Sequence, residues 1–151
     1  MQRFGAQKYF KLKYEPYFYG PYSGKVRYLL NALNGSYIMG YSDMNKKPFE
    51  PLTLVADGYD TVVEYVREKP ELKEIITKTT SLLEGFYSDF ALELLSSVDY
   101  IANTENNLEK EFIAQKLNQW SDRKRSMFSN VQYIDISINR LEKFLYNSND
   151  K

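Results

Sequence analysis

This sequence contains no cysteine and no histidine. Without cysteine there can be no disulfide, no thiolate metal site and no thiol nucleophile. Without histidine the chain lacks the commonest general base and metal ligand, and therefore any Ser-His or Cys-His nucleophile pair. Catalysis would have to use carboxylates, lysine, tyrosine or serine. We therefore predict that the protein is not an enzyme and that it binds no metal or other cofactor.

The sequence also lacks long apolar runs. None approaches the roughly 18 residues that a membrane span requires, and the N-terminus has no apolar signal-peptide segment. We therefore predict a cytoplasmic protein with no membrane partner. The glycines match no phosphate-binding loop. Carboxylates do recur at helical spacing, as in Glu64 and Glu68, but on faces expected to be solvated, so no catalytic pair is assigned.

Aromatic and charged residues are unevenly distributed. Of 14 Tyr, 9 Phe and 1 Trp, residues 1–47 hold eleven. Residues 1–47 have eight Lys and Arg against two acidic residues, a net charge of +6, and residues 48–151 have twelve against eighteen, a net charge of −6. A basic segment rich in tyrosine suits single-stranded nucleic acid or a protein partner. The alternative is a strand-rich segment with a solvated lysine face.

The first third predicts a strand, a helix and a hairpin. Residues 8–19 alternate apolar and charged side chains, which is typical of an edge strand interrupted by Pro16, with a turn at Gly20-Pro21. A helix follows from Ser23 to Asn34 and ends at Asn34-Gly35. Short strands at 37–39 and 51–55 form a β-hairpin with a polar tip at 42–47.

The remainder is predicted to be helical. The expected helices cover residues 57–69, 71–84, 89–102, 105–120 and 131–146, with a basic turn at 123–125. The helix 89–102 is the most apolar and is expected to be central. We predict an α+β, mainly α fold: a partial winged-helix-like strand, helix and hairpin followed by a bundle of about five helices. It forms one domain, residues 1–151, with a flexible tail at 147–151.

Seven residues are candidates for partner binding. Tyr17, Tyr19 and Tyr22 crowd a turn, so at least one of them is expected to be exposed. Lys25 and Arg27 lie on the helix that follows. Arg123 and Lys124 either offset a helix dipole at its C-terminus or form an anion-binding patch. The adjacent Trp120 is expected in the core. The candidates are Tyr17, Tyr19, Tyr22, Lys25, Arg27, Arg123 and Lys124.

The chain opens with Gln2-Arg3-Phe4-Gly5, which looks like the last turn of a helix closed by glycine. We therefore expect that helices preceding this turn are missing from the chain.

Three sequence blocks carry a family resemblance. They run from Tyr19-Gly20-Pro21-Tyr22-Ser23 to Asp43, from Leu83-Glu84-Gly85-Phe86 to Ser96-Ser97-Val98, and from Trp120-Ser121-Asp122-Arg123-Lys124 to Phe128. With these blocks in this order, the chain resembles the C-terminal, toxin-binding domain of DarG-type antitoxins. YwgA-like and Panacea-type antitoxin domains share a similar Gly-Pro-Tyr turn and are more distant.

The resemblance implies a function as well as a fold. In DarG-type antitoxins this domain binds the DarT toxin, an ADP-ribosyltransferase that acts on single-stranded DNA, and blocks its DNA site. A macrodomain in those proteins removes ADP-ribose from DNA, and nothing in this chain resembles it. The chain is thus expected to be a non-enzymatic antitoxin-like module. It would mimic DNA and so sequester a toxin that is encoded nearby. The alternative is a winged-helix nucleic-acid-binding regulator, and single-stranded DNA ranks behind the toxin as a partner.

Overall fold

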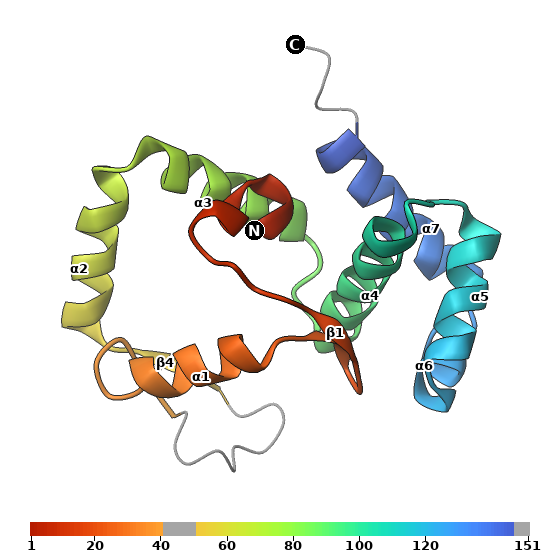
Figure 1. Cartoon of the computed structure of the whole chain (residues 1–151), viewed down its shortest axis with the longest axis horizontal. Helices are drawn as coiled ribbons and strands as arrows, with labels where there is room; N and C mark the ends of the chain where they lie inside the picture. The colour runs from red at the N-terminus through yellow and green to blue at the C-terminus, as the bar shows by residue number, and fades with distance from the viewer. Residues whose placement is uncertain (41–50, 147–151) are drawn as a thin grey trace. The chain divides into compact units, whose positions relative to one another are not determined.

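The computed structural model describes residues 1–40 and 51–146 of the protein (Figure 1). These residues form mainly helices with two small antiparallel sheets, which confirms the predicted mainly α, α+β class. They fall into two compact units. Of the described residues, the first unit comprises 1–13, 23–40 and 51–77, and the second comprises 14–22 and 78–146. The single domain expected from the sequence stays a prediction.

The second unit contains the hydrophobic core. Its helices are α4 (Asp89–Glu105), α5 (Lys110–Trp120), α6 (Asp122–Met127) and α7 (Val131–Leu141), and a π-helical turn, η3 (Glu142–Tyr146), continues α7. α4 packs against both α5 and α7 (Figure 1). Its inward face supplies Leu94, Leu95, Val98 and Ile101 to the core. The prediction that this helix is central is therefore confirmed.

The first unit buries much less apolar surface. It contains 3₁₀ turns η1 (Gln2–Phe4) and η2 (Ala6–Lys8), helices α1 (Gly24–Leu33) and α2 (Ala56–Arg67), strands β3 (Ile38–Met39) and β4 (Thr53–Leu54), and the first part of α3 (Pro70–Leu83). No residue of α1 is buried. The buried residues among those described in this unit are Ala6, Ser23, Gly58 and Ile75.

Two turns of the first unit close as their glycines predict. Gly5 follows η1 with φ +96°, and its N–H bonds to the carbonyl of Gln2 at 3.0 Å. Gly35 follows α1 with φ +89°, which confirms the predicted helix end. Both are left-handed conformations that glycine adopts without strain.

The order strand, helix, hairpin is present, but the strands form separate sheets. β2 (Gly20–Tyr22) pairs with β1 (Glu15–Tyr17), and β3 pairs with β4. The likeness to a winged helix is thus limited to the order of elements. The predicted polar tip at 42–47 and the predicted tail at 147–151 lie outside the described residues.

Three local predictions are corrected. The strand expected over 8–19 is confined to Glu15–Tyr17, because residues 6–8 form η2 and the Phe10 N–H bonds back to the Ala6 carbonyl at 2.9 Å. The turn expected at Gly20-Pro21 lies instead at Phe18-Tyr19, and Gly20 begins a strand. The basic turn at 123–125 is part of a short helix, α6, which Ser121 caps by accepting the Lys124 N–H at 3.2 Å.

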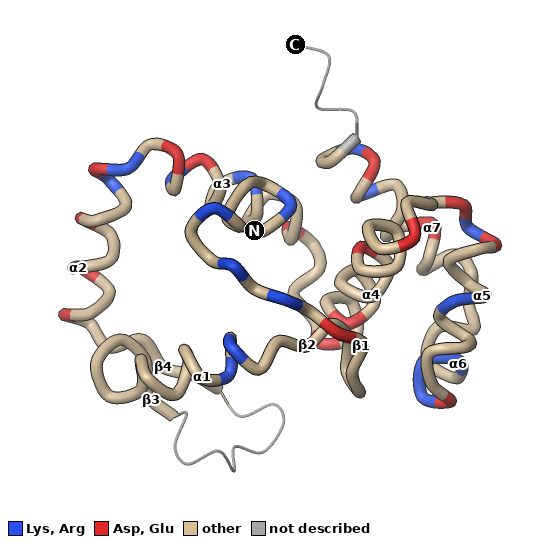
Figure 2. The backbone as a smooth tube through the Cα atoms, in the orientation of Figure 1, with Lys and Arg blue, Asp and Glu red and all other residues tan. Residues whose placement is uncertain are grey.

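The charge pattern follows the elements (Figure 2). In the first unit, Lys and Arg mark the N-terminal segment and the start of α1, whereas α2 carries mainly Asp and Glu. Among the described residues, no helix combines the length and apolarity needed to cross a bilayer.

Candidate partner-binding site

A short hairpin in the second unit presents three neighbouring aromatic side chains to solvent. Tyr17, Phe18 and Tyr19 are 59%, 60% and 44% exposed, and we call them the aromatic tip. The Tyr17 ring lies 4.9 Å from that of Tyr22, and the Phe18 ring meets the Tyr19 ring edge-on at 5.3 Å. Aromatic side chains, tyrosine and tryptophan above all, are enriched among the residues that anchor protein interfaces.

Two prolines face each other across this hairpin. Pro16 pairs with Pro21, between the pairs Glu15 with Tyr22 and Tyr17 with Gly20. In an antiparallel ladder, pairs that exchange hydrogen bonds alternate with pairs that do not. Pro16 and Pro21 have no backbone N–H, so they are tolerated opposite each other at a pair that exchanges no hydrogen bonds. Each proline ring also fixes its own φ. The prolines therefore stiffen the strands without breaking the ladder.

Gly20 brings the hairpin onto α4. It is buried, with φ +140°, a conformation that side chains with a Cβ rarely adopt. A Cβ at this position would lie 3.2 Å from Ser96 Oγ and 3.7 Å from Ser97 Oγ. The two serine hydroxyls are turned to the Glu93 carbonyl, at 3.2 and 2.6 Å. Glycine is thus required here both for backbone conformation and for close approach to the helix.

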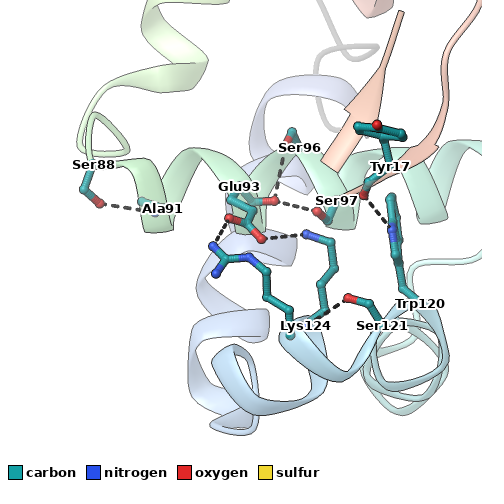
Figure 3. Close-up of polar contacts among 10 residues, drawn as sticks. Tyr17, Ser88, Ala91, Glu93, Ser96, Ser97, Trp120, Ser121 and Lys124 are labelled. Atoms are coloured by element: carbon teal, nitrogen blue, oxygen red, sulfur yellow. Dashed lines mark hydrogen bonds and ion pairs between the residues drawn. The ribbon is translucent and has the colours of Figure 1, made fainter. Parts of the chain in front are cut away.

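Trp120 anchors strand β1 of the hairpin to the helical bundle. Its indole Nε1 donates to the Tyr17 carbonyl at 3.0 Å (Figure 3), and its ring meets the Tyr100 ring edge-on at 5.6 Å. The tryptophan, expected in the core, packs at its margin with part of the ring exposed. It links the base of the aromatic tip to the end of α5.

A charged cluster of three residues lies beneath the hairpin. Lys124 Nζ is 3.0 Å from Glu93 Oε1 (Figure 3), and Arg123 Nη2 is 2.8 Å from Glu93 Oε2. Each carboxylate oxygen thus accepts from one cation. The Lys124 side chain is fully buried, with Nζ 5.1 Å from the Trp120 ring and 5.2 Å from the Phe128 ring.

The pKa values of the two cations shift in opposite directions. Burial lowers the pKa of Lys124, and the hydrogen bond and charge of Glu93 oppose that effect. The hydrogen bond to Glu93 raises the pKa of Arg123, whose guanidinium Cζ lies 5.0 Å from the Tyr19 ring. Arg123 therefore bridges the buried carboxylate and the aromatic tip, whereas Lys124 is enclosed by the bundle.

The structure brings five of the seven predicted residues together. Tyr17, Tyr19, Tyr22, Arg123 and Lys124 all belong to the second unit, around the hairpin and α6. The basic pair does not form an open patch, because Lys124 is enclosed and both cations pair with Glu93.

The other two predicted residues, Lys25 and Arg27, are exposed on α1 in the first unit. Binding of a partner by any of the seven stays a prediction.

Two residues of this site were missed by the sequence reasoning. Phe18 lies between two tyrosines that were predicted to bind a partner. It is exposed because the turn lies at Phe18-Tyr19, whereas the Gly20-Pro21 pair had suggested a turn two residues later. Glu93 was the single charge in the apolar stretch from Phe90 to Val98. A lone carboxylate on such a helix signals a buried pair, and the basic residues 123–125 were the available partners.

The arrangement defines a helical bundle that displays a docked aromatic hairpin, built from three segments distant in sequence. No family model matches the chain. It is similar to proteins named DNA ADP-ribosyl glycohydrolase from Mycobacterium tuberculosis and Mycobacterium bovis, with 27% identity over 135 residues in each. Each Mycobacterium match covers 86% of this chain and 38% of the relative. A protein of that name from Thermus aquaticus is 26% identical over 106 residues, which cover 70% of the chain and 29% of the relative. The chain thus spans about a third of the length of these relatives.

These relatives support the relation to DarG, and they also correct one prediction. They are named for a glycohydrolase, so the prediction that this protein is not an enzyme is overturned. The prediction relied on the missing cysteine and histidine. That absence excludes only chemistry that depends on those side chains and leaves carboxylates, lysine, tyrosine and serine.

Proposed function

We propose that this chain is a toxin-binding module of a DarG-type toxin–antitoxin pair. It would sequester an ADP-ribosyltransferase toxin encoded nearby by occupying the toxin's DNA site. The similarity to DNA ADP-ribosyl glycohydrolases over most of the chain supports the pairing. The exposed aromatic tip, held on the bundle by Gly20 and Trp120, is the observation that carries the proposal.

The chemistry of the tip suits a DNA site. Proteins that bind single-stranded DNA stack bases on aromatic rings and attract phosphates with cations. An occupant of such a site should offer rings and carboxylates in place of bases and phosphates. The hairpin offers the rings and one carboxylate, that of Glu15, which is exposed on β1.

A binding titration tests this proposal. The chain is titrated with the toxin and, separately, with single-stranded DNA, each at two salt concentrations. Phe18→Ala removes a 60% exposed ring, and Tyr87→Ala, at 66% exposure in the same unit, is the matched control. We expect 1:1 toxin binding that Phe18→Ala weakens by about 2 kcal/mol or more, as for an interface anchor. Tyr87→Ala should leave the affinity unchanged.

The other outcomes are equally informative. Absence of toxin binding, or equal loss in both variants, would contradict the proposal. A second assay tests the activity for which the relatives are named, DNA ADP-ribosyl glycohydrolase. The chain is incubated with DNA that the toxin has ADP-ribosylated, and release of ADP-ribose is measured.

One observation favours a second candidate, a nucleic-acid-binding regulator. Lys25 and Arg27 are exposed on α1, which a β-hairpin follows as it would in a winged helix. That function predicts DNA affinity that falls steeply with salt and that Lys25→Glu weakens. DNA binding of this kind without toxin binding would favour the regulator over the toxin-binding module.

A further inference from the structure

Arg123 occupies the junction between the aromatic tip and the charged cluster. Its Nη2 donates to Glu93 Oε2 at 2.8 Å, and its Cζ lies 5.0 Å from the centroid of the Tyr19 ring. The arginine side chain is 35% exposed, whereas the Glu93 side chain is 7% exposed. One guanidinium therefore touches a buried carboxylate and a ring that solvent reaches.

The orientation of this guanidinium is set from inside the protein. Lys124 Nζ holds the other oxygen of Glu93, so the plane of the carboxylate is fixed by two cations. Glu93 itself lies on α4, the central helix of the core. The Arg123 Nε is buried with no hydrogen-bond partner among the described residues, so the Glu93 bond rather than a second anchor orients the group.

We propose that Arg123 is a positioning residue for the aromatic tip. Its ion pair with Glu93 fixes the guanidinium, and the guanidinium holds the Tyr19 ring in the orientation that the toxin binds. This inference rests on the proposed function, because it assigns Arg123 to the same surface. It adds that the tip is preformed in the free protein and that the charged cluster sets the orientation of the Tyr19 ring.

Preformation has a kinetic consequence. If only a fraction of the free molecules carries the tip in its binding orientation, the apparent affinity falls by that fraction. The loss then appears as slower association, because the bound complex is the same once formed. Truncating a residue that is buried against the toxin would instead change mainly the dissociation rate, and loss of a charge at the rim would change association in a salt-dependent way.

The experiment compares Arg123→Gln with Arg125→Gln. Both remove one arginine charge from α6, but Arg125 is 62% exposed and pairs with Asp122. Rates of toxin binding are measured by surface plasmon resonance. We expect Arg123→Gln to slow association about tenfold, as for a competent fraction reduced to a tenth, with dissociation unchanged. Arg125→Gln should leave both rates unchanged. Arg123→Lys keeps the charge but not the planar group, and should fall between them.

The single tryptophan reports the tip without any toxin. Trp120 bonds to the Tyr17 carbonyl, so a loosened tip should increase acrylamide quenching of its fluorescence. We expect this increase for Arg123→Gln and not for Arg125→Gln. In a Tyr19→Ala background Arg123→Gln should have no further effect on association, because the ring that it positions is gone.

The possible failures are distinguishable. Absence of toxin binding by the unmodified chain would overturn the proposed function. Normal binding with faster dissociation of Arg123→Gln would overturn the positioning role and indicate direct contact. Normal binding with unchanged rates and quenching in both Arg123 variants would show that Arg123 does not position the tip. If Arg123→Gln does not fold, the association and dissociation rates of Arg123→Lys test the positioning role instead. Slower association with unchanged dissociation would support it.

Discussion

A fully buried lysine is costly unless its charge is compensated, and Lys124 has one carboxylate and two aromatic rings around it. Lys124→Ala removes one of the two cations from the buried Glu93 and leaves a void beside Trp120. We expect the free energy of unfolding to fall by about 3–5 kcal/mol, as for a broken buried pair. Urea unfolding followed by circular dichroism measures it.

The matched control is Lys116→Ala on α5. Lys116 pairs with Glu105 at 2.7 Å, but both side chains are about one-third exposed or more. Surface pairs contribute about 0–1 kcal/mol. Equal losses in the two lysine variants would contradict the buried pairing of Lys124.

The same cluster predicts a pH dependence. Burial lowers the pKa of Lys124 from 10.5, and Glu93 opposes that shift. Glu93→Gln removes the opposing charge, so the folded-state pKa falls further. Between that value and 10.5 the unfolded chain then binds more protons than the folded protein, and stability must rise with pH. We expect this rise to be steeper than in the unmodified protein at pH values below 10.5.

Urea midpoints collected from neutral pH upward measure this slope. The series ends about one unit below the ordinary tyrosine pKa of about 10, so that most tyrosines keep their protons. Parallel curves for Glu93→Gln and the unmodified protein would mean that another group compensates Lys124.

At the scale of elements, the hairpin depends on one glycine. Gly20→Ala places a Cβ at φ +140° and 3.2 Å from Ser96 Oγ. We expect it to cost about 1–3 kcal/mol from backbone strain, with a further loss from forcing β2 away from α4. Thermal unfolding measures the cost, and Trp120 fluorescence reports whether the hairpin has moved from its anchor.

Gly35→Ala is the control for strain alone. Gly35 also has positive φ, +89°, but a Cβ there would meet nothing within 4 Å. A loss for Gly20→Ala no greater than that for Gly35→Ala, with unchanged Trp120 fluorescence, would contradict the close approach of hairpin and helix.

Most helices could be predicted from the sequence, because apolar residues at helical spacing mark the face that each helix buries. The end of α1 was also predictable, since Asn34-Gly35 specifies a left-handed stop. The hairpin was predicted less well. Alternation over 8–19 suggested one strand, but a strand needs a partner, and the pairing of Glu15 with Tyr22 depends on contacts between distant segments.

The site shows the same limit. The run Tyr17 to Tyr22 was identified because aromatics at a turn are rarely all packed. The role of Lys124 could not be read from Arg123-Lys124-Arg125, since nothing local distinguishes a buried cation from an exposed one. Lys124 is the buried cation because its ammonium pairs with Glu93, which lies about 30 residues earlier in the chain.

At the scale of the whole molecule, the two units differ in how much they bury. The large apolar core lies in the second unit, whereas α1 has no buried residue and Tyr59 and Tyr65 on α2 are 53% and 56% exposed. Amide protection follows burial and local stability. We therefore expect hydrogen exchange, measured by mass spectrometry, to be slowest in α4 and α7 and markedly faster in α1 and α2. Equal protection in the two sets of helices would contradict this difference.

Adding the toxin to the same exchange experiment separates binding at the tip from a general stabilisation. A ligand that binds only the folded state slows every exchange event that requires global unfolding, and those amides lie in α4 and α7. Amides of Tyr17, Phe18 and Tyr19 exchange through local opening, so they gain protection only if the toxin covers the hairpin. We expect residues 15–22 to be protected at exchange times too short for global unfolding. Protection of α4 and α7 alone would place the toxin elsewhere on the molecule.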